Sequence, residues 1–367
     1  MKIRAAVSRP GAAAPIIEEL DLAAPRADEV LVRIRAAGVC HTDLRAHQGG
    51  LLPTPHPVVL GHEGAGIVEA VGAGVLHLRE GDHVVLSGSS CGVCASCRDN
   101  HPTSCHEVMP RSFGGQRMDG SSALSQQGRL IHGHFFGQSS FATHAIADGR
   151  GAVRLDADVP FAIAAPLGCG VLTGAGAVLH AFALKPGATL VVFGAGSVGL
   201  SAIMAARLAG ASQIIAVEPR PQRRALALEL GATAALDAGS DEVPAQVRQL
   251  LPQGADFALN TTVVPQVYEW SVQVLAMRGV AAFVSVPPVA VHIPLQTLLS
   301  GARSLRGIIN GDAVPQRTIP LLIDHWRRGR FPMDRLITAF GFEAIADAFA
   351  AIHQGTVIKP VLLLDPS

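Results

Sequence analysis

The chain has 367 residues, of which 49% are hydrophobic and 16% are charged. Its 29 lysines and arginines equal its 29 aspartates and glutamates. This balance excludes a protein that binds nucleic acid through a general basic surface, because binding to phosphates needs an excess of positive charge. The apolar content excludes a disordered chain, and the length predicts two domains, each with its own core.

The N-terminal segment and two apolar stretches bear on the compartment. Residues 1–7 carry charges before any apolar core develops, so we expect no secretory signal. The stretches 159–184 and 186–206 reach the length of a membrane-spanning helix, but their glycines and Pro166 predict turns instead. We therefore expect a cytoplasmic protein that crosses no membrane, in which clustered cysteines bind metal or act in catalysis.

The predicted elements change character along the chain. Short strands alternate with glycine-rich turns over the first 150 residues, for example at 30–34, 65–71 and 83–86, which predicts a small barrel-like β unit. From about residue 185, strands alternate with helices. Strands are predicted at 189–193, 213–217, 257–260 and 280–286. One helix is predicted to end at residue 208, and two more are predicted at 221–230 and 265–277. This alternation predicts βαβ units on a parallel sheet. A helix at 319–328 and a strand at 361–364 follow.

A glycine-rich turn, Gly194-Ala195-Gly196-Ser197-Val198-Gly199, joins the strand at 189–193 to a helix. In that context the first glycine permits a tight turn, the second lets the backbone approach a pyrophosphate, and the third packs the helix on the strand. Glu218 ends the next strand and is predicted to accept hydrogen bonds from ribose hydroxyls, which favours NAD over NADP. The neighbouring Arg220, Arg223 and Arg224 leave NADP open, and a turn without a ligand is the remaining alternative.

Four cysteines lie within 15 residues: Cys91, Cys94, Cys97 and Cys105. Thiolates at this spacing can close a tetrahedral cage without an open position, which is typical of structural zinc. An iron–sulfur cluster uses the same ligands, but the spacing matches neither ferredoxin pattern. Four cysteines without a metal are the other alternative.

The two remaining cysteines, Cys40 and Cys169, are far apart in the sequence. Cys40 begins Cys40-His41-Thr42-Asp43, and His62-Glu63 follows within Gly61–Gly64. Two thiolates and one imidazole form a ligand set that leaves a fourth position on zinc open for water or substrate. Taken singly, each residue has a plainer interpretation: a buried cysteine packs as a small hydrophobe, and a lone histidine is simply hydrogen-bonded.

Together and in this order, these motifs resemble the zinc-dependent medium-chain alcohol dehydrogenases over essentially the whole chain. The resemblance rests on Gly61–Gly66, the four-cysteine lobe and Gly194–Gly199, and the stretches 135–141, 166–176 and 330–332 are most similar to the aryl (benzyl) alcohol dehydrogenases. It implies an α/β fold: a GroES-like, β-rich catalytic domain at residues 1–169 and 310–367, with a structural zinc lobe at 91–105, and a Rossmann domain at 170–309 whose doubly wound parallel sheet binds NAD.

The resemblance also implies a role for each site residue. Cys40, His62 and Cys169 hold the catalytic zinc, Glu63 lies behind it, Asp43 orients His62, and Thr42 takes the proton from the alcohol. An ordinary carboxylate at a helix start is the alternative for Asp43. The residues implied to contact the cofactor are His41, Thr173, Gly194, Gly196, Ser197, Val198, Gly199, Glu218, Arg223 and Lys359, with His41 and Lys359 at the pyrophosphate.

The implied activity is the reversible oxidation of a primary aromatic or allylic alcohol to its aldehyde by NAD, with two zinc ions per subunit of a homo-oligomer. The same chemistry on terpenoid, aliphatic or polyol alcohols is the alternative. A non-catalytic NAD- and zinc-binding scaffold is disfavoured because no catalytic ligand is missing. The strand at 280–286 is expected to pair across a two-fold axis.

Four positions depart from the family pattern. Arg45 stands where members with a full proton relay have histidine, with His47 as the alternative relay residue. Asn260 stands where an acidic residue is expected after the fourth Rossmann strand, and Asn310 stands where glutamate is frequent in aryl-type relatives. Gly88 lies near positions where bulky residues often wall the substrate pocket, which predicts a roomier pocket than that of a simple benzyl enzyme.

Overall fold

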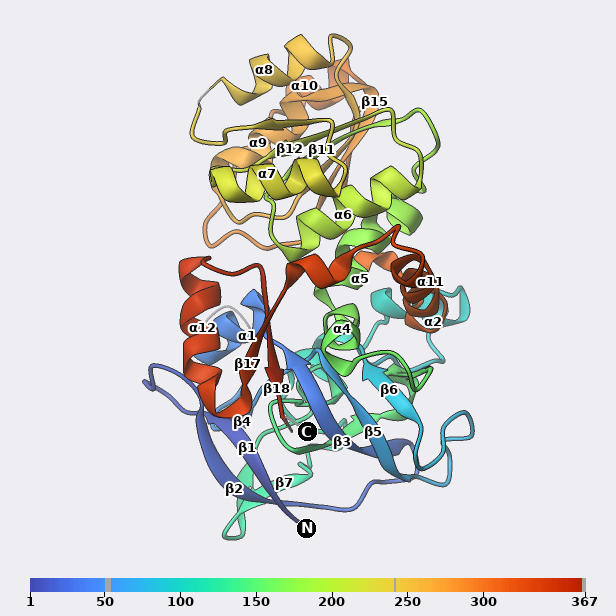
Figure 1. The fold of residues 1–367 in the computed structure, drawn as a ribbon, viewed down its shortest axis with the longest axis vertical. Coiled ribbons are helices and arrows are strands. Elements are labelled where there is room, and N and C mark those ends of the chain that lie inside the picture. The colour runs from blue at the N-terminus through green and yellow to red at the C-terminus, as the bar shows by residue number, and fades with distance from the viewer. Residues whose placement is uncertain (50–53, 241, 365–367) are drawn as a thin grey trace. The chain divides into compact units, whose positions relative to one another are not determined.

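The computed structural model describes residues 1–49, 54–240 and 242–364, which cluster into two compact units (Figure 1). The first unit comprises Met1–Cys169, Val314–Leu321 and Met333–Ser367. The second comprises Gly170–Ala313 and Leu322–Pro332. Each unit contains buried apolar side chains that form a core of its own.

Two β-sheets form the first unit. The five-stranded sheet has the order β4 (Val58–Val59), β1 (Lys2–Ser8), β2 (Ile16–Leu22), β7 (Leu124–Gln126) and β8 (Arg129–Ile131). The seven-stranded sheet has the order β10 (Ala152–Leu155), β6 (His83–Leu86), β5 (Gly64–Val71), β3 (Glu29–Gly38), β18 (Lys359–Leu363) and β17 (Ile337–Gly341), and β9 (His144–Asp148) also pairs with β3. The strands predicted at 30–34, 65–71 and 83–86 are confirmed within β3, β5 and β6.

Period-2 alternation explains how the first unit forms its core. In β3, Val30, Val32 and Ile34 are fully buried while the residues between them are partly exposed, as expected for a strand with one face inward. These side chains pack with apolar residues of both sheets in one cluster. Helices α1 (His41–Gln48), α2 (Ala95–Arg98), α3 (Val108–Phe113), α4 (Phe161–Ala164) and α12 (Ile345–Gln354) complete the unit.

A six-stranded, fully parallel sheet forms the centre of the second unit. Its order is β13 (Ala234–Leu236), β12 (Gln213–Val217), β11 (Thr189–Phe193), β14 (Ala255–Asn260), β15 (Leu275–Phe283) and β16 (Ser304–Gly307). The connecting helices are α5 (Gly170–Gly176), α6 (Ser197–Leu208), α7 (Pro221–Leu230), α8 (Val243–Leu250), α9 (Pro265–Gln273) and α10 (Leu295–Ser300), with α11 (Pro315–Arg327) after the sheet. Figure 1 shows α6 and α7 in front of the sheet and α9 behind it. The strand order reverses between β11 and β14, which is where ligands bind in such sheets.

The predicted boundaries around β15 are wrong. The helix predicted at 265–277 ends at Gln273, because the Ala255 N–H bonds the Val274 carbonyl and draws the following residues into the sheet. β15 ends at Phe283, ahead of Pro287 and Pro288, which have no N–H for a ladder. The sequence predicts that the strand at 280–286 pairs with its copy in a second subunit across a two-fold axis. This prediction is also wrong, because both edges of β15 are already hydrogen-bonded within the chain, one to β14 and the other to β16.

No single helix among the described residues is long and apolar enough to cross a membrane. Two consecutive helices, 161–168 and 170–181, reach that length and composition only when they are taken together.

Candidate metal centres and dinucleotide site

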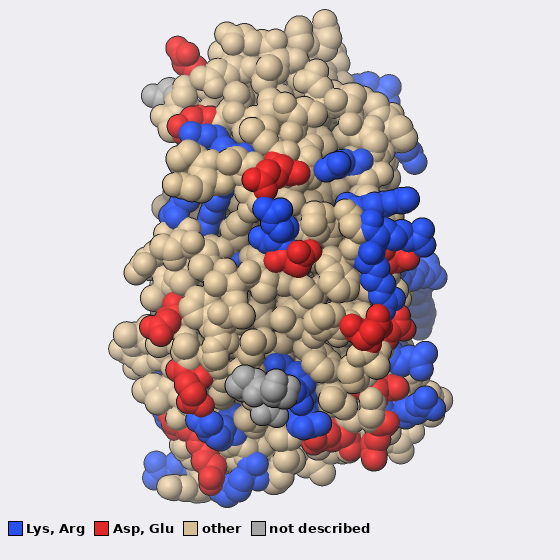
Figure 2. Space-filling model, in the orientation of Figure 1, with Lys and Arg blue, Asp and Glu red and all other residues tan. Residues whose placement is uncertain are grey.

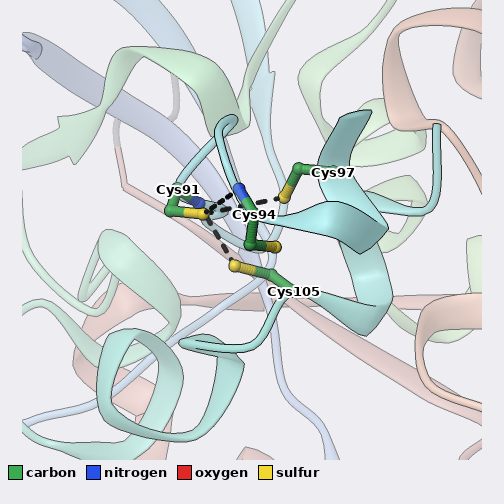
Figure 3. A group of neighbouring side chains, drawn as sticks. All are labelled: Cys91, Cys94, Cys97 and Cys105. Atoms are coloured by element: carbon green, nitrogen blue, oxygen red, sulfur yellow. Dashed lines mark hydrogen bonds between the residues drawn. The ribbon is translucent and has the colours of Figure 1, made fainter. Parts of the chain in front are cut away.

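The four cysteines of residues 91–105 converge on one point in the first unit (Figure 3). Their sulfur atoms lie within 4.8 Å of one another. Backbone N–H groups donate to these sulfurs: those of Val93 and Cys94 to Cys91 Sγ at 3.5 and 3.3 Å, and those of Cys91 and Glu107 to Cys105 Sγ at 3.3 and 3.4 Å. Such hydrogen bonds favour the thiolate, and at Cys94 those from the backbone N–H groups of His106 and Cys97 lower the pKa to about 6. A closed set of four thiolates with backbone support fits a structural Zn²⁺.

A second group of possible metal ligands lies in the same unit, formed by Cys40, His62, Glu63 and Cys169. One ligand atom of each residue lies within 4.8 Å of the others. Cys40 stands between β3 and α1, His62 and Glu63 stand just before β5, and Cys169 follows the short helix Ala165–Gly168. His62 and Glu63 are completely buried and Cys169 is nearly so. Residues from three distant parts of the chain therefore meet in one enclosed place.

The imidazole of His62 is set up to act as a ligand through Nε2. Its Nδ1 lies 2.9 Å from Oδ1 of the buried Asp43, which also accepts the backbone N–H of Gly61 at 3.1 Å. Oδ2 of Asp43 accepts the Cys40 N–H at 2.9 Å. A carboxylate acceptor fixes the proton on Nδ1 and leaves the lone pair on Nε2. That nitrogen is buried without a hydrogen-bond partner among the described residues, which is what a bound metal would relieve.

The two thiols beside His62 interact with each other. The hydrogen bond between them lowers the pKa of Cys40 well below its usual range and raises that of Cys169, and burial raises the latter further. The Cys40 sulfur also lies 3.8 Å from Thr42 Oγ1. One thiolate, one thiol and one imidazole with a free lone pair form the donor set of an open zinc site.

Glu63, a member of this group, also forms a buried ion pair. Lys359 Nζ donates to both carboxylate oxygens of Glu63 at 2.9 Å and to the Val39 carbonyl at 3.3 Å. Both charged side chains are essentially inaccessible to water. Burial raises the pKa of Glu63. The pyrophosphate contact implied for Lys359 remains a prediction, and in this structure the ammonium already faces three acceptors.

Sequence reasoning missed two features that support these ligands. A Cβ atom at Gly38 would lie 2.0 Å from Glu63 Oε2, so only glycine leaves room for that carboxylate. The ring of Phe136 stacks on His62 with centroids 4.5 Å apart. Phe136 has φ of 55°, a backbone conformation that is strained for a bulky residue. Neither feature has a local sequence signal, because each depends on a partner far along the chain.

The residues predicted to act beside the metal ligands, and the alternative relay histidine, lie on α1. His41 is exposed at its first position and Thr42 is partly exposed at the second. His47 is buried, and its ring nitrogens lie 2.7 Å from Ser8 Oγ and 2.9 Å from the Ala12 carbonyl. Both nitrogens of the alternative relay histidine therefore already have partners.

The glycine-rich turn of the second unit fits a dinucleotide. Gly194 has φ of 92°, and a Cβ at Gly199 would lie 1.8 Å from the Gly194 carbonyl oxygen, so both glycines are required by the fold. A Cβ at Gly196 would meet no atom within 4 Å. Because Gly196 also has an ordinary φ of −83°, nothing in the protein demands glycine there. The open space is what a pyrophosphate needs at the N-terminus of α6, where Ser197 and Val198 form the first turn.

Glu218 lies at the carboxyl end of β12, next to this turn. It is buried, and its oxygens accept the backbone N–H groups of Ala195 at 2.8 Å and Arg220 at 3.1 Å. Arg223 lies on α7, where burial lowers the pKa of its guanidinium. Thr173 is buried on α5 of the same unit. The structure thus gathers the glycine turn and Glu218 at one end of the sheet.

Comparisons with known proteins match this arrangement. Residues 26–156 match the model of the alcohol dehydrogenase GroES-like domain, and residues 197–326 match that of the zinc-binding dehydrogenases. A geraniol dehydrogenase from Castellaniella defragrans is 45% identical over 364 residues, which cover 98% of this chain and 97% of that protein. The chain belongs to the zinc-binding alcohol dehydrogenases.

Solved structures of this family agree with the whole fold. The crystal structure of benzyl alcohol dehydrogenase from Acinetobacter calcoaceticus is 38% identical, with a TM-score of 0.95 and complete coverage of both chains. A zinc-binding alcohol dehydrogenase domain protein from Burkholderia ambifaria is 44% identical, with a TM-score of 0.96 over 100% of this chain and 99% of that one. The GroES-like and Rossmann folds predicted from the sequence are confirmed, and the protein is a dehydrogenase that uses zinc and a nicotinamide dinucleotide.

Proposed function

We propose that this alcohol dehydrogenase oxidises a primary aromatic or allylic alcohol to its aldehyde with NAD⁺, reversibly. The observation that carries the proposal is the Cys40, His62 and Cys169 donor set. Because Lys359 already binds both carboxylate oxygens of Glu63, the fourth member of the group, three ligands remain and leave a metal position open for substrate. The relatives support the substrate class: geraniol and benzyl alcohol, which two of them are named for, both carry their CH₂OH group on an sp² carbon. Geraniol is also a terpenoid, so the aromatic and terpenoid alternatives share this reacting group.

Each side chain at the metal site is assigned one role in the proposed reaction. Zinc, when bound, makes the hydroxyl of an alcohol more acidic, and the nicotinamide accepts the hydride. Cys40, His62 and Cys169 hold the metal, and Asp43 keeps His62 in the tautomer that can bind it. Thr42, at the start of α1 beside Cys40, takes the proton from the alcohol. Glu63 would supply negative charge next to the ligand atoms and is itself held by Lys359.

For the cofactor, we assign the phosphates to the turn at Gly194–Gly199 and the adenosine ribose to Glu218. A buried carboxylate at the end of β12 accepts hydroxyl donors and repels a 2′-phosphate, which favours NAD over NADP. Arg224 is occupied, since it donates to the carbonyls of Glu218 and Pro219 and pairs with Asp237. His41, Thr173, Arg223 and Lys359 are assigned to the cofactor by resemblance alone.

Assembly and location are proposed on separate observations. β16 is exposed at every residue and ends the sheet of the second unit, and Leu295 and Leu299 of α10 are exposed as well. Such an edge is suited to pairing with a second copy of the chain, so we propose a homo-oligomer. None of the six cysteines, all of which the structure describes, forms a disulfide, which supports a cytoplasmic location. Figure 2 shows basic side chains gathered along the right edge of the drawn face and acidic ones near them, but the equal numbers of acidic and basic residues in the chain favour no nucleic-acid partner.

A substrate panel tests the proposed function. We expect benzyl alcohol and geraniol to give kcat/KM values at least about tenfold above those of ethanol or a polyol, and NAD⁺ to be preferred over NADP⁺. The absence of a bulky residue at Gly88 predicts that larger aryl and terpenoid alcohols are also accepted. Activity on small unbranched alcohols alone would overturn the substrate class, and no hydride transfer with any alcohol in the zinc-loaded protein would favour a non-catalytic scaffold.

A further inference from the structure

The side-chain amide of Asn260 has an unused donor inside the second unit. Asn260 is the last residue of β14 and is 1% exposed. Its Oδ1 accepts the backbone N–H and the hydroxyl of Thr262 at 2.8 and 2.9 Å. Because a backbone N–H can only donate, the orientation of the amide is fixed. Nδ2 is therefore left as a buried donor, with no partner among the residues that the structure describes.

This donor stands at the point where the strand order of the sheet reverses. Asn260 is paired with Phe193 of β11 on one side and with Phe283 of β15 on the other. The next residue, Thr261, donates its backbone N–H to the Phe193 carbonyl at 3.0 Å, and its hydroxyl bonds the same oxygen at 2.8 Å. A Cβ on Gly194 would lie 2.6 Å from Thr261 Oγ1. The segment after β14 is thus packed against the glycine turn that receives the pyrophosphate.

The strand order also indicates which part of the cofactor reaches this point. Glu218 at the end of β12 lies on one side of β11, and Asn260 at the end of β14 lies on the other. With the adenosine ribose at Glu218 and the pyrophosphate at the turn beyond β11, the molecule crosses toward β14 with its nicotinamide half. That half carries phosphate and ribose oxygens, which accept hydrogen bonds. A buried N–H without an acceptor is unfavourable and rare in folded proteins, so it calls for such a partner.

We propose that Asn260 is a cofactor-binding residue, whose Nδ2 donates a hydrogen bond to a phosphate or ribose oxygen in the nicotinamide half of the dinucleotide. Oδ1 anchors the amide to Thr262, and Nδ2 is the group presented to the ligand. An acidic side chain in this place would offer acceptors alone, so the asparagine of this chain adds a contact that a carboxylate cannot make. The inference rests on the proposed dinucleotide site.

Equilibrium binding of NADH, ADP-ribose and AMP to the zinc-loaded protein tests this role without turnover. Asn260→Asp keeps the anchoring oxygen and the size of the side chain but removes the donor, and Asn260→Leu removes the donor without adding charge. Thr262→Val is the matched control, because it removes one bond to Oδ1 and leaves Nδ2 in place. We expect both Asn260 variants to raise the Kd for NADH and ADP-ribose about five- to tenfold or more, with AMP changed less than about twofold and Thr262→Val close to wild type.

Three results would overturn the inference. The first is Asn260→Leu binding NADH as tightly as wild type, and the second is an equal loss for AMP, which lacks the nicotinamide half. The third is a loss in Thr262→Val as large as in Asn260→Asp, which would assign the effect to the shape of the loop. Thermal midpoints of the ligand-free variants identify loss of folding. If the wild-type protein itself fails to bind NADH, the proposed cofactor site fails together with this inference.

Discussion

Two substitutions in the glycine turn are predicted to have opposite consequences. For Gly196→Ala, the new methyl group meets no protein atom within 4 Å, and φ of −83° suits alanine. Gly196 is the N-cap of α6, where alanine costs about 0.5–1 kcal/mol. Alanine also lowers the conformational entropy of the unfolded chain, which stabilises the folded protein by about 0.4–1 kcal/mol. The free energy of unfolding should therefore change by less than about 0.5 kcal/mol, while the methyl group occupies the space proposed for the pyrophosphate.

Gly199→Ala provides the contrast in the same turn. Its Cβ would lie 1.8 Å from the backbone oxygen of Gly194, so α6 has to move off β11. We expect a loss of about 3 kcal/mol or more in stability. Urea denaturation and NADH titration of both variants are the assays. Gly196→Ala should unfold with the wild type and bind NADH at least about tenfold more weakly. An unchanged Kd for NADH in a folded Gly196→Ala protein would refute the assignment of this turn.

Three further predictions concern the first unit. Asp43→Asn should weaken zinc binding at the His62 site about 10- to 100-fold, measured by chelator competition, and zinc at the four-cysteine lobe should be unaffected; equal loss at both sites would contradict the role of Asp43. Cys94→Ser should chiefly lower the thermal midpoint of unfolding, with little effect on kcat of the protein that remains folded. Cys40→Ser should abolish turnover with little change in the thermal midpoint. Equal catalytic loss in the two variants, both fully folded, would contradict this division of roles. Burial lowers the pKa of His134 to about 4, whereas the unfolded chain takes up this proton near pH 6.5. Stability should therefore be lost as pH falls from about 6.5 to about 4, by up to about 3 kcal/mol, and His134→Asn should remove this part of the pH dependence of urea unfolding; an unchanged slope would show that His134 is protonated in the fold.

The sequence was sufficient to predict β3, β5, β6, β11, β12 and β14 and the grouping of the cysteines, whereas strands such as β1, β2 and β16 were not predicted. Glycine-rich turns and hydrophobic periodicity are local signals, and cysteine spacing limits how thiolates can gather. The boundary between α9 and β15 was missed because it is set by pairing with Ala255, some twenty residues earlier. A local helical pattern carries no information about a neighbouring strand.

Supporting contacts around the candidate site were less predictable than the ligands themselves. Lys359 and Glu63 form a buried pair although they are separated by 296 positions, and Gly38 is required because that carboxylate packs against it. In the sequence, Asn260 stands out only as a departure from an acidic pattern. Its unused donor became visible once the bonds of Oδ1 were known. These features depend on three-dimensional packing, which single-residue patterns do not encode.

The central claim is that Cys40, His62 and Cys169 hold a metal on which an alcohol is oxidised by NAD⁺. The most direct test follows NADH formation from benzyl alcohol and geraniol before chelation, after removal of zinc, and after zinc is added back. We predict that turnover is lost on chelation and restored by zinc in the wild-type protein, but not restored in Cys40→Ser. Undiminished turnover in protein shown to contain no zinc, or restored turnover in the Cys40→Ser variant, would contradict the account.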